Sequence, residues 1–265
     1  TQREQAMRRM AERGATVVLG VGFAQADAIS KVAAEFPDTK FSIIDVSWLD
    51  APNLRQYAFK EHEGSYIVGI AAAKASKTGK VGFVGGMDIG LIRRFACGYV
   101  GGVKSINASA EVYQNMTGTT PAAWNDPAKG AELTQSQIDR GADVVYHAAG
   151  GTGAGVIQAA ADAGKLAIGV DSNQNGMAPG SVLTSMLKRV DVAAYETFMD
   201  VKNGNFSAGV HVLGLAEGGV DWALDENNAS LVTADMKAAI ESARADIVSG
   251  KVKVHDYFSD ESCPY

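Results

Sequence analysis

Residues 166–171, Leu-Ala-Ile-Gly-Val-Asp, decide the fold class of this chain. The apolar run predicts a buried parallel strand that ends abruptly in Asp171. The polar segment 172–176, Ser-Asn-Gln-Asn-Gly, cannot continue a strand. Ligands of open α/β sheets bind just beyond the carboxyl ends of strands, so Asp171 lies where a binding carboxylate is expected. The alternative is that Asp171 only caps the turn that follows.

A second strand ends in the same way, because residues 40–44, Lys-Phe-Ser-Ile-Ile, are followed directly by Asp45. This repetition favours a binding role for both aspartates. Along the chain, apolar segments of strand length alternate with amphipathic segments of helix length and short glycine-containing turns. Such alternation predicts an α/β protein with parallel sheets and helices on their faces.

The strand-and-helix rhythm restarts after a break at residues 76–79, Ser-Lys-Thr-Gly. We therefore expect two similarly built lobes, with the first boundary after residue 78. The helix predicted over 63–75 is rich in Gly, Ala and Ser, which suits close packing against another element. Residues 218–221 are expected to form a turn, and residues 259–265 a frayed tail.

Composition excludes several classes of protein. The 265 residues carry a net charge of −6 and contain no basic cluster, which argues against a nucleic-acid partner. No run approaches the roughly 18 apolar residues of a membrane span. A signal peptide is not visible either, but Thr1 is not a natural start, and we expect that processing or truncation removed the preceding residues.

The cysteines and histidines predict neither a metal site nor a cofactor. Cys97 and Cys263 are the only cysteines, and their spacing matches no zinc or redox motif. They could form one disulfide or stay separate, and the sequence gives no positive reason for a pair. The four histidines are scattered along the chain, and no catalytic triad or carboxylate pair can be assembled.

The glycine-rich segment 150–155, Gly-Gly-Thr-Gly-Ala-Gly, lacks the Gly-Lys-Ser/Thr ending of a phosphate-binding P-loop. A turn at Gly150 whose backbone approaches a neutral ligand, or simple close packing of helices, fits better. The aromatic residues Phe23, Trp48 and Trp124 follow predicted strands, and each is interpreted either as core or as a platform for a planar ligand.

Lys188 follows an apolar strand over 182–187 that leads to the same sheet edge as Asp171. Helix N-termini disfavour cations, so the position is unusual for a merely solvated lysine. We hypothesise that its ammonium lies near a strand-end carboxylate, keeps that carboxylate ionised, and donates a hydrogen bond to the ligand.

Segments along the whole chain, including 22–23, 36–38, 41–45, 98–102 and 141–145, resemble the basic membrane protein family of bacterial solute-binding lipoproteins, and four more do so at greater length. These four are 63–69 (Glu-Gly-Ser-Tyr-Ile-Val-Gly), 81–87 (Val-Gly-Phe-Val-Gly-Gly-Met), 168–171 with Gln174, and 184–191 (Thr-Ser-Met-Leu-Lys-Arg-Val-Asp). The resemblance covers nearly the whole chain. It implies a type I periplasmic-binding-protein fold, in which two doubly wound parallel-sheet lobes are joined by three crossovers and close over a ligand cleft. The lobes would comprise 1–78 plus about 188–214, and 79–187 plus about 215–265.

Characterised members of that family mostly bind purine nucleosides, so the resemblance implies a ligand such as adenosine, guanosine or inosine. Asp45 and Asp171 would hold sugar hydroxyls, and Trp124 or Phe23 would stack on the base. The implied partner is the membrane permease of an ABC importer. The protein would be a monomer in the bacterial periplasm or at the outer face of the cytoplasmic membrane, where a lipid anchor would hold it.

The chain departs from the family pattern in two places. Gln25 stands where many members have a second aromatic residue after the Gly-Phe pair. The family also opens with a strand and an acidic turn, whereas this chain starts at the following helix; the sheet would be left with an open edge or a gap, and we expect the sequence to be incomplete at its start. The alternatives to a receptor are a nucleoside-processing enzyme on the same scaffold and the ligand-sensing domain of a regulator.

Overall fold

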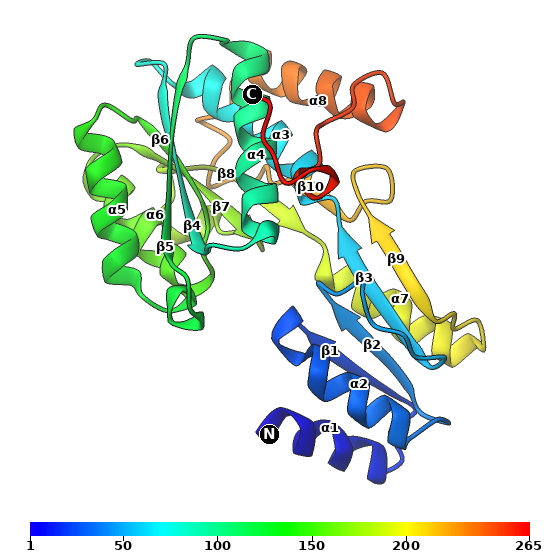
Figure 1. The fold of residues 1–265 in the computed structure, drawn as a ribbon. Helices are drawn as coiled ribbons and strands as arrows, with labels where there is room; N and C mark the ends of the chain where they lie inside the picture. The colour runs from blue at the N-terminus through cyan, green and yellow to red at the C-terminus, as the bar shows by residue number, and fades with distance from the viewer. The chain divides into compact units, whose positions relative to one another are not determined.

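A computed structural model describes all of residues 1–265, and the chain divides into two compact units (Figure 1). Unit 1 comprises Thr1–Lys60 and Arg189–Gly219, and unit 2 comprises Glu61–Lys188 and Val220–Tyr265. The chain therefore passes between the units three times. The first passage precedes helix α3 (Glu61–Ala75), which belongs to unit 2, whereas we expected it after residue 78.

Unit 1 contains a four-stranded parallel sheet in the order β1-β2-β3-β9. Its strands are β1 (Val17–Val21), β2 (Lys40–Ile44), β3 (Leu54–Phe59) and β9 (Gly209–Leu213), and its helices are α1 (Gln2–Glu12), α2 (Ala26–Glu35) and α7 (Val190–Asn203). The strands form one continuous sheet with β1 at an open edge. We expected either an open edge or a gap in this sheet, and the structure shows an open edge.

Helices cover both faces of this sheet. Phe41 and Ile43 point into an apolar core shared with α1 and α2. Ser42, between them, contacts the Thr197 hydroxyl of α7 at 3.3 Å, and side chains alternate in direction along a strand. Helix α7 therefore lies on the face opposite α1 and α2.

Unit 2 contains a six-stranded sheet in the order β10-β8-β7-β6-β4-β5. Its strands are β4 (Lys80–Met87), β5 (Glu111–Gly118), β6 (Val144–Ala148), β7 (Leu166–Asp171), β8 (Val182–Lys188) and β10 (Val220–Trp222). Besides α3, its helices are α4 (Gly90–Ile106), α5 (Pro127–Asp139), α6 (Gly153–Asp162) and α8 (Ala234–Val248). Strand β10 runs antiparallel to β8 and begins inside the segment 218–221, which we had expected to be only a turn.

The two faces of this sheet are covered by different helix pairs. Phe83 and Tyr146 form an aromatic cluster with Tyr99 of α4, with ring centroids 5.1 to 6.4 Å apart. On the other face, Gln137 of α5 donates to the Phe83 carbonyl and lies against Gly82. Helices on the faces of a mainly parallel sheet, expected from the alternating pattern, are confirmed.

Helices α3 and α4 pack without intervening side chains. A Cβ atom added at Gly102 would lie 1.9 Å from the Tyr66 carbonyl oxygen, and one added at Gly98 would lie 2.4 Å from the His62 carbonyl oxygen. These glycines let the two backbones touch, as the small residues of 63–75 predicted. The closeness also explains why α3 belongs to unit 2.

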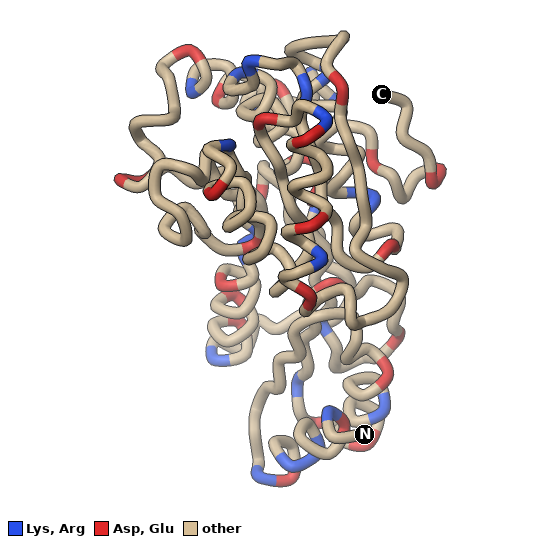
Figure 2. The backbone as a smooth tube through the Cα atoms, turned by 90° about the vertical axis from the view of Figure 1, so that its left-hand side faces the viewer, with Lys and Arg blue, Asp and Glu red and all other residues tan.

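Within unit 2, the segment 254–265 is held against helix α4, which corrects the expectation of a frayed tail over 259–265. Cys263 forms a disulfide with Cys97 of α4 across 166 residues of sequence. The backbone N–H of His255 donates to the Tyr265 hydroxyl at 3.0 Å. Figure 2 shows Lys and Arg interspersed with Asp and Glu along the chain, without a basic cluster.

Candidate functional site

Asp45 and Asp171 share an unusual backbone conformation. Asp45 follows the last residue of β2, Asp171 is the last residue of β7, and both have φ = 66°. This left-handed region is costly for residues with a Cβ atom, although aspartate tolerates it better than most. Such strain persists where the surrounding structure imposes it, and it is concentrated at functional sites. The two strand-end carboxylates found from the sequence are therefore conformationally alike, each within its own unit.

The turn after Asp171 is fixed by Gln174. The Gln174 carboxamide oxygen accepts the Val170 N–H at 2.9 Å, and the Gln174 N–H donates to the Ser185 hydroxyl of β8 at 2.9 Å. Gln174 thus ties the turn to both strands, β7 and β8. Asp171 itself is an exposed residue at this edge.

His147 of β6 completes the support beneath this turn. Its Nε2 lies 2.9 Å from the Gln174 carboxamide oxygen, which can only accept, so Nε2 carries the proton. The Nδ1 atom is buried without a hydrogen-bond partner beside Gly153, at the start of α6. Burial lowers the pKa of His147 to about 4, so the imidazole is neutral at pH 7. Sequence reasoning had found no role for this histidine.

Trp124 lies at the same edge of the unit 2 sheet. It ends the short helix η2 (Pro121–Trp124), and its ring lies against Gly86 of β4, where an added Cβ would approach it to 2.3 Å. The hydroxyls of Thr117 and Thr152 both donate to the Ala123 carbonyl, at 2.9 and 2.8 Å. These bonds fix the backbone next to Trp124, and the half-buried indole packs on β4.

Gly150 begins the short helix η3 (Gly150–Thr152) with φ = 56°. A Cβ atom added at Gly150 would lie 3.3 Å from the Trp124 carbonyl oxygen. A Cβ at Gly155 would lie 1.9 Å from the Pro127 carbonyl oxygen. The glycine-rich segment thus serves close packing with η2 and α5, one of the two expected alternatives. Gly150 itself is exposed, so the other alternative, in which its backbone lies beside a ligand, stays a prediction.

Phe23 occupies the corresponding edge in unit 1. It opens the short helix η1 (Phe23–Gln25), which is separated from β1 only by Gly22, and Val21 pairs with Ile44 in the parallel register. Phe23 and Asp45 therefore lie at the same sheet edge. Phe23 is half-buried and packs against the unit 1 core, whereas Trp48 is 64 % exposed.

Lys188 ends β8, next to Asp171 across the parallel pair β7–β8, where Asp171 pairs with Leu187. The side chain is buried, and its Nζ lies 3.2 Å from Oε1 of Glu61 and 5.8 Å from the centre of the Phe95 ring. Glu61 is the first residue of α3 and follows the last residue of β3 by two positions. The lysine thus has a neighbouring carboxylate, but this one stands at the start of a helix, whereas we expected one at the end of a strand.

Sequence reasoning did not single out Glu61. It stands in the polar run Lys-Glu-His-Glu at 60–63, a pattern typical of a solvated helix start, yet its side chain is 1 % exposed. Arg94 of α4 donates from Nη1 to its other oxygen at 2.9 Å. The sequence feature that could have identified Glu61 is the short connection between an apolar strand, β3, and a helix, α3, with acidic residues in its first turn.

The model of the family described as "ABC transporter substrate-binding protein PnrA-like" matches residues 1–257. The chain belongs to this family. Members of the PnrA-like family are substrate-binding components of ABC transporters and not enzymes. The basic membrane proteins are among its relatives, so the resemblance found in the sequence is confirmed.

Individual relatives agree with this assignment. The chain is 35 % identical over 261 residues to the ABC transporter nucleoside-binding protein BmpA of Lactococcus lactis subsp. cremoris, covering 92 % of this chain and 72 % of the relative. It is 32 % identical over 245 residues to basic membrane protein D of Borreliella burgdorferi, covering 90 % and 70 %. The crystal structure of an ABC transporter solute-binding protein from Aeropyrum pernix K1 superposes with a TM-score of 0.83 at 28 % identity, over 95 % of this chain and 80 % of that one.

These likenesses confirm the type I periplasmic-binding-protein fold. Substrate-binding proteins of ABC importers work outside the cytoplasm, and this location follows for the PnrA-like chain. No helix in the structure combines the length and apolar character needed to cross a membrane. A disulfide between Cys97 and Cys263 agrees with an oxidising compartment.

Proposed function

We propose that the chain is the receptor of an ABC importer for a purine nucleoside. The observation that carries the proposal is the pair of strand-end aspartates with the same left-handed backbone, Asp45 and Asp171. Family membership supplies the transport role, and the nucleoside-binding name of the Lactococcus lactis relative supports the ligand class.

The chemistry of a nucleoside suits the residues at these edges. A ribose diol offers two donors, and one carboxylate can accept both in charge-assisted bonds. We assign this role to Asp171 and a second hydroxyl or base contact to Asp45. The purine is flat and apolar on its faces, and stacking on Trp124 or Phe23 would contribute about 1–3 kcal/mol.

Lys188 is proposed to donate from its ammonium to the ligand while Glu61 compensates its charge at 3.2 Å. The backbone of Gly150 is proposed to lie beside the bound ligand. We further propose that the two units close over the nucleoside, that the closed monomer docks on a membrane permease, and that a lipid anchor holds it at the outer face of the cytoplasmic membrane or in the periplasm.

Isothermal titration calorimetry with adenosine, guanosine and inosine tests the ligand class. We expect 1:1 binding of at least one nucleoside and a loss of about 1–3 kcal/mol for its 2′-deoxy analogue, because the carboxylate would be left with an unfilled acceptor. Ribose and free bases serve as controls for each half of the ligand. Binding of ribose or of a free base as tightly as every nucleoside would refute the proposal.

Two further measurements address the mechanism. Small-angle scattering with and without ligand should show a smaller radius of gyration in the complex, and an unchanged radius would exclude closure. Chromatography of the ligand recovered after prolonged incubation should return intact nucleoside. Recovered free base would favour the nucleoside-processing enzyme instead.

A further inference from the structure

Residues 254–265 run along one stripe of helix α4. Gly90, Arg94, Cys97 and Gly101 follow one another at intervals of four, three and four residues, which places them on the same helix face. Phe258 lies against Gly90, where an added Cβ would be 2.9 Å from its ring. The segment therefore follows α4 from its first turn onward.

The other contacts along the stripe are equally close. Cys263 is bonded to Cys97, and the Tyr265 ring lies 2.6 Å from a Cβ added at Gly101. The Arg94 guanidinium carbon lies 5.0 Å from the centre of the Phe258 ring. These contacts leave little freedom for the segment to move relative to α4.

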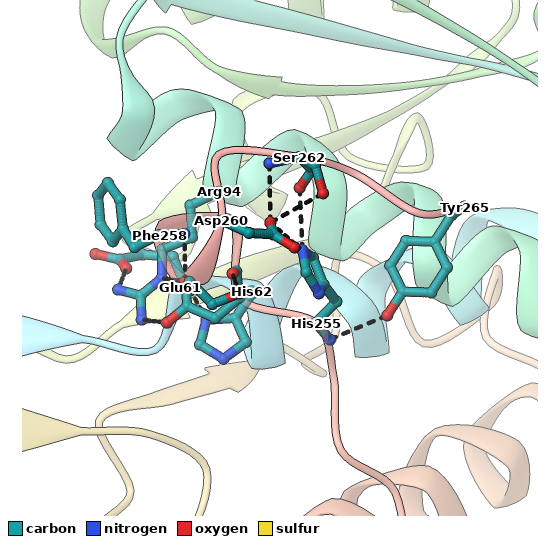
Figure 3. Close-up of polar contacts among 10 residues, drawn as sticks. Glu61, His62, Arg94, His255, Phe258, Asp260, Ser262 and Tyr265 are labelled. Carbon is teal, nitrogen blue, oxygen red and sulfur yellow. Dashed lines mark hydrogen bonds and ion pairs between the residues drawn. The ribbon is translucent and has the colours of Figure 1, made fainter.

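Asp256 of this segment holds the Arg94 guanidinium from one side. Arg94 donates from Nε to Oδ1 at 2.8 Å and from Nη2 to Oδ2 at 2.6 Å, a two-pronged pair. Although burial opposes it, the hydrogen bonds from Arg94 hold the pKa of Asp256 below its usual value. Figure 3 shows Arg94 between Glu61 and the ring of Phe258, with Tyr265 and His255 in a separate group.

The remaining Arg94 nitrogen reaches Glu61, whose two oxygens are divided between two cations. Nη1 of Arg94 lies 2.9 Å from Oε2, and Nζ of Lys188 lies 3.2 Å from Oε1. The side chains of Arg94, Glu61 and Lys188 are 8, 1 and 5 % exposed, so these ion pairs are shielded from water. Burial makes each charge dependent on its partner's position.

We propose that Asp256 is a positioning residue for Lys188, acting through Arg94 and Glu61, and that the disulfide-fastened segment 254–265 is therefore part of the machinery of ligand binding. Without the Asp256 carboxylate, the Arg94 guanidinium would form a bidentate pair with Glu61. A bidentate arginine–carboxylate pair is stronger than the single contact between Glu61 and the Lys188 ammonium. Glu61 would then be drawn from Lys188, and the ammonium would lose its orientation. The inference rests on the proposed role of Lys188 in binding.

The first test compares Asp256→Asn with Asp200→Asn. Asp200 pairs with the buried Arg55 at 2.7 Å and is 37 % exposed, close to the 33 % of Asp256, but it lies in unit 1. By calorimetry, Asp256→Asn should bind nucleoside about five- to tenfold more weakly and Asp200→Asn within twofold of the wild type, given the size of one charged hydrogen bond. Equal affinities of the two variants would overturn the proposal.

Coupling to Lys188 separates positioning from a general loss of stability. In a Lys188→Met background, Asp256→Asn should cause no further loss of affinity, because its effect passes through the missing ammonium. Additive losses would show that Asp256 acts on the fold alone. The double variant Cys97→Ser/Cys263→Ser, which unfastens the segment without removing a buried charge, should weaken binding in the same direction, and unchanged affinity would count against the segment.

A measurement without ligand keeps the proposal testable apart from the nucleoside assignment. In spectra of protein labelled with ¹⁵N-lysine, the Lys188 ammonium signal is identified by its absence from Lys188→Met. It should shift or broaden in Asp256→Asn and stay in place in Asp200→Asn. A signal that is unchanged in Asp256→Asn would refute the positioning role. Failure of every nucleoside to bind, with the expected spectral change, would refute only the proposed function.

Discussion

Replacing Asp171 by glycine, alanine or asparagine separates its two roles, as a carboxylate and as a residue with a left-handed backbone. At φ = 66°, a Cβ atom costs about 1–2 kcal/mol, a strain that glycine does not carry. Glycine also gives the unfolded chain more freedom, which costs about 0.4–1 kcal/mol. The net expectation is that Asp171→Gly is more stable than Asp171→Ala by about 1 kcal/mol.

Binding should respond differently from stability. Both variants lose two charge-assisted hydrogen bonds of about 1.5–3 kcal/mol each, so affinity should fall by roughly 10² to 10⁴-fold. Asp171→Asn keeps one acceptor and tolerates the backbone, and it should lie between these variants and the wild type. Calorimetry with the preferred nucleoside and urea unfolding measure the two quantities.

Two results would contradict this reasoning. A glycine variant that binds within threefold of the wild type would remove the Asp171 carboxylate from the site. Glycine and alanine variants of equal stability would show that the left-handed conformation at this position stores no strain.

Three other perturbations have defined outcomes. The pKa of His147 is about 4 in the folded state and near 6.5 in the unfolded state, so the unfolded state binds more protons between these two values. The free energy of unfolding should therefore be highest above pH 6.5 and fall by up to about 3 kcal/mol toward pH 4, as measured by urea titrations. The variant His147→Gln should lose this pH dependence. The disulfide between Cys97 and Cys263 joins residues 166 positions apart in the sequence. Its reduction should lower the free energy of unfolding by about 2–5 kcal/mol, and an unchanged urea midpoint would contradict this expectation. Gly102→Ala places a Cβ atom 1.9 Å from a backbone oxygen and should lower the free energy of unfolding by about 1–3 kcal/mol. Gly176→Ala, at a position with room for a Cβ atom, should change the melting temperature little. Similar melting temperatures of the two variants would contradict the packing argument.

The regular elements could be predicted because their signals are local. Strand β7, for example, is visible as an apolar run that stops at Asp171, and α8 as a helix whose Thr233 hydroxyl accepts the Met236 N–H at 3.1 Å. The strand-end aspartates were found for the same reason, since parallel strands direct their carboxyl ends to one edge.

Other features depend on distant partners and leave no local trace. The small residues of α3 indicated close packing, but nothing in 63–75 names Gly98 and Gly102 as the partners, so the unit boundary was placed too late. The disulfide joins residues too far apart for spacing to be informative. Glu61 looked solvated because its burial depends on Arg94 and on Lys188, which is separated from it by most of unit 2.

The interrupted course of unit 1 along the chain has a consequence for biosynthesis. Strands β3 and β9 pair side by side, yet about 150 residues separate Phe59 from Gly209, and five of the six strands of unit 2 are made in that interval. At about 5–20 residues per second, synthesis of these residues takes roughly 8–30 seconds, and β3 lacks its β9 partner for that time. Unit 1 can therefore complete its sheet only after most of unit 2 has been made, and an unpaired strand edge in that interval is a place where aggregation can begin.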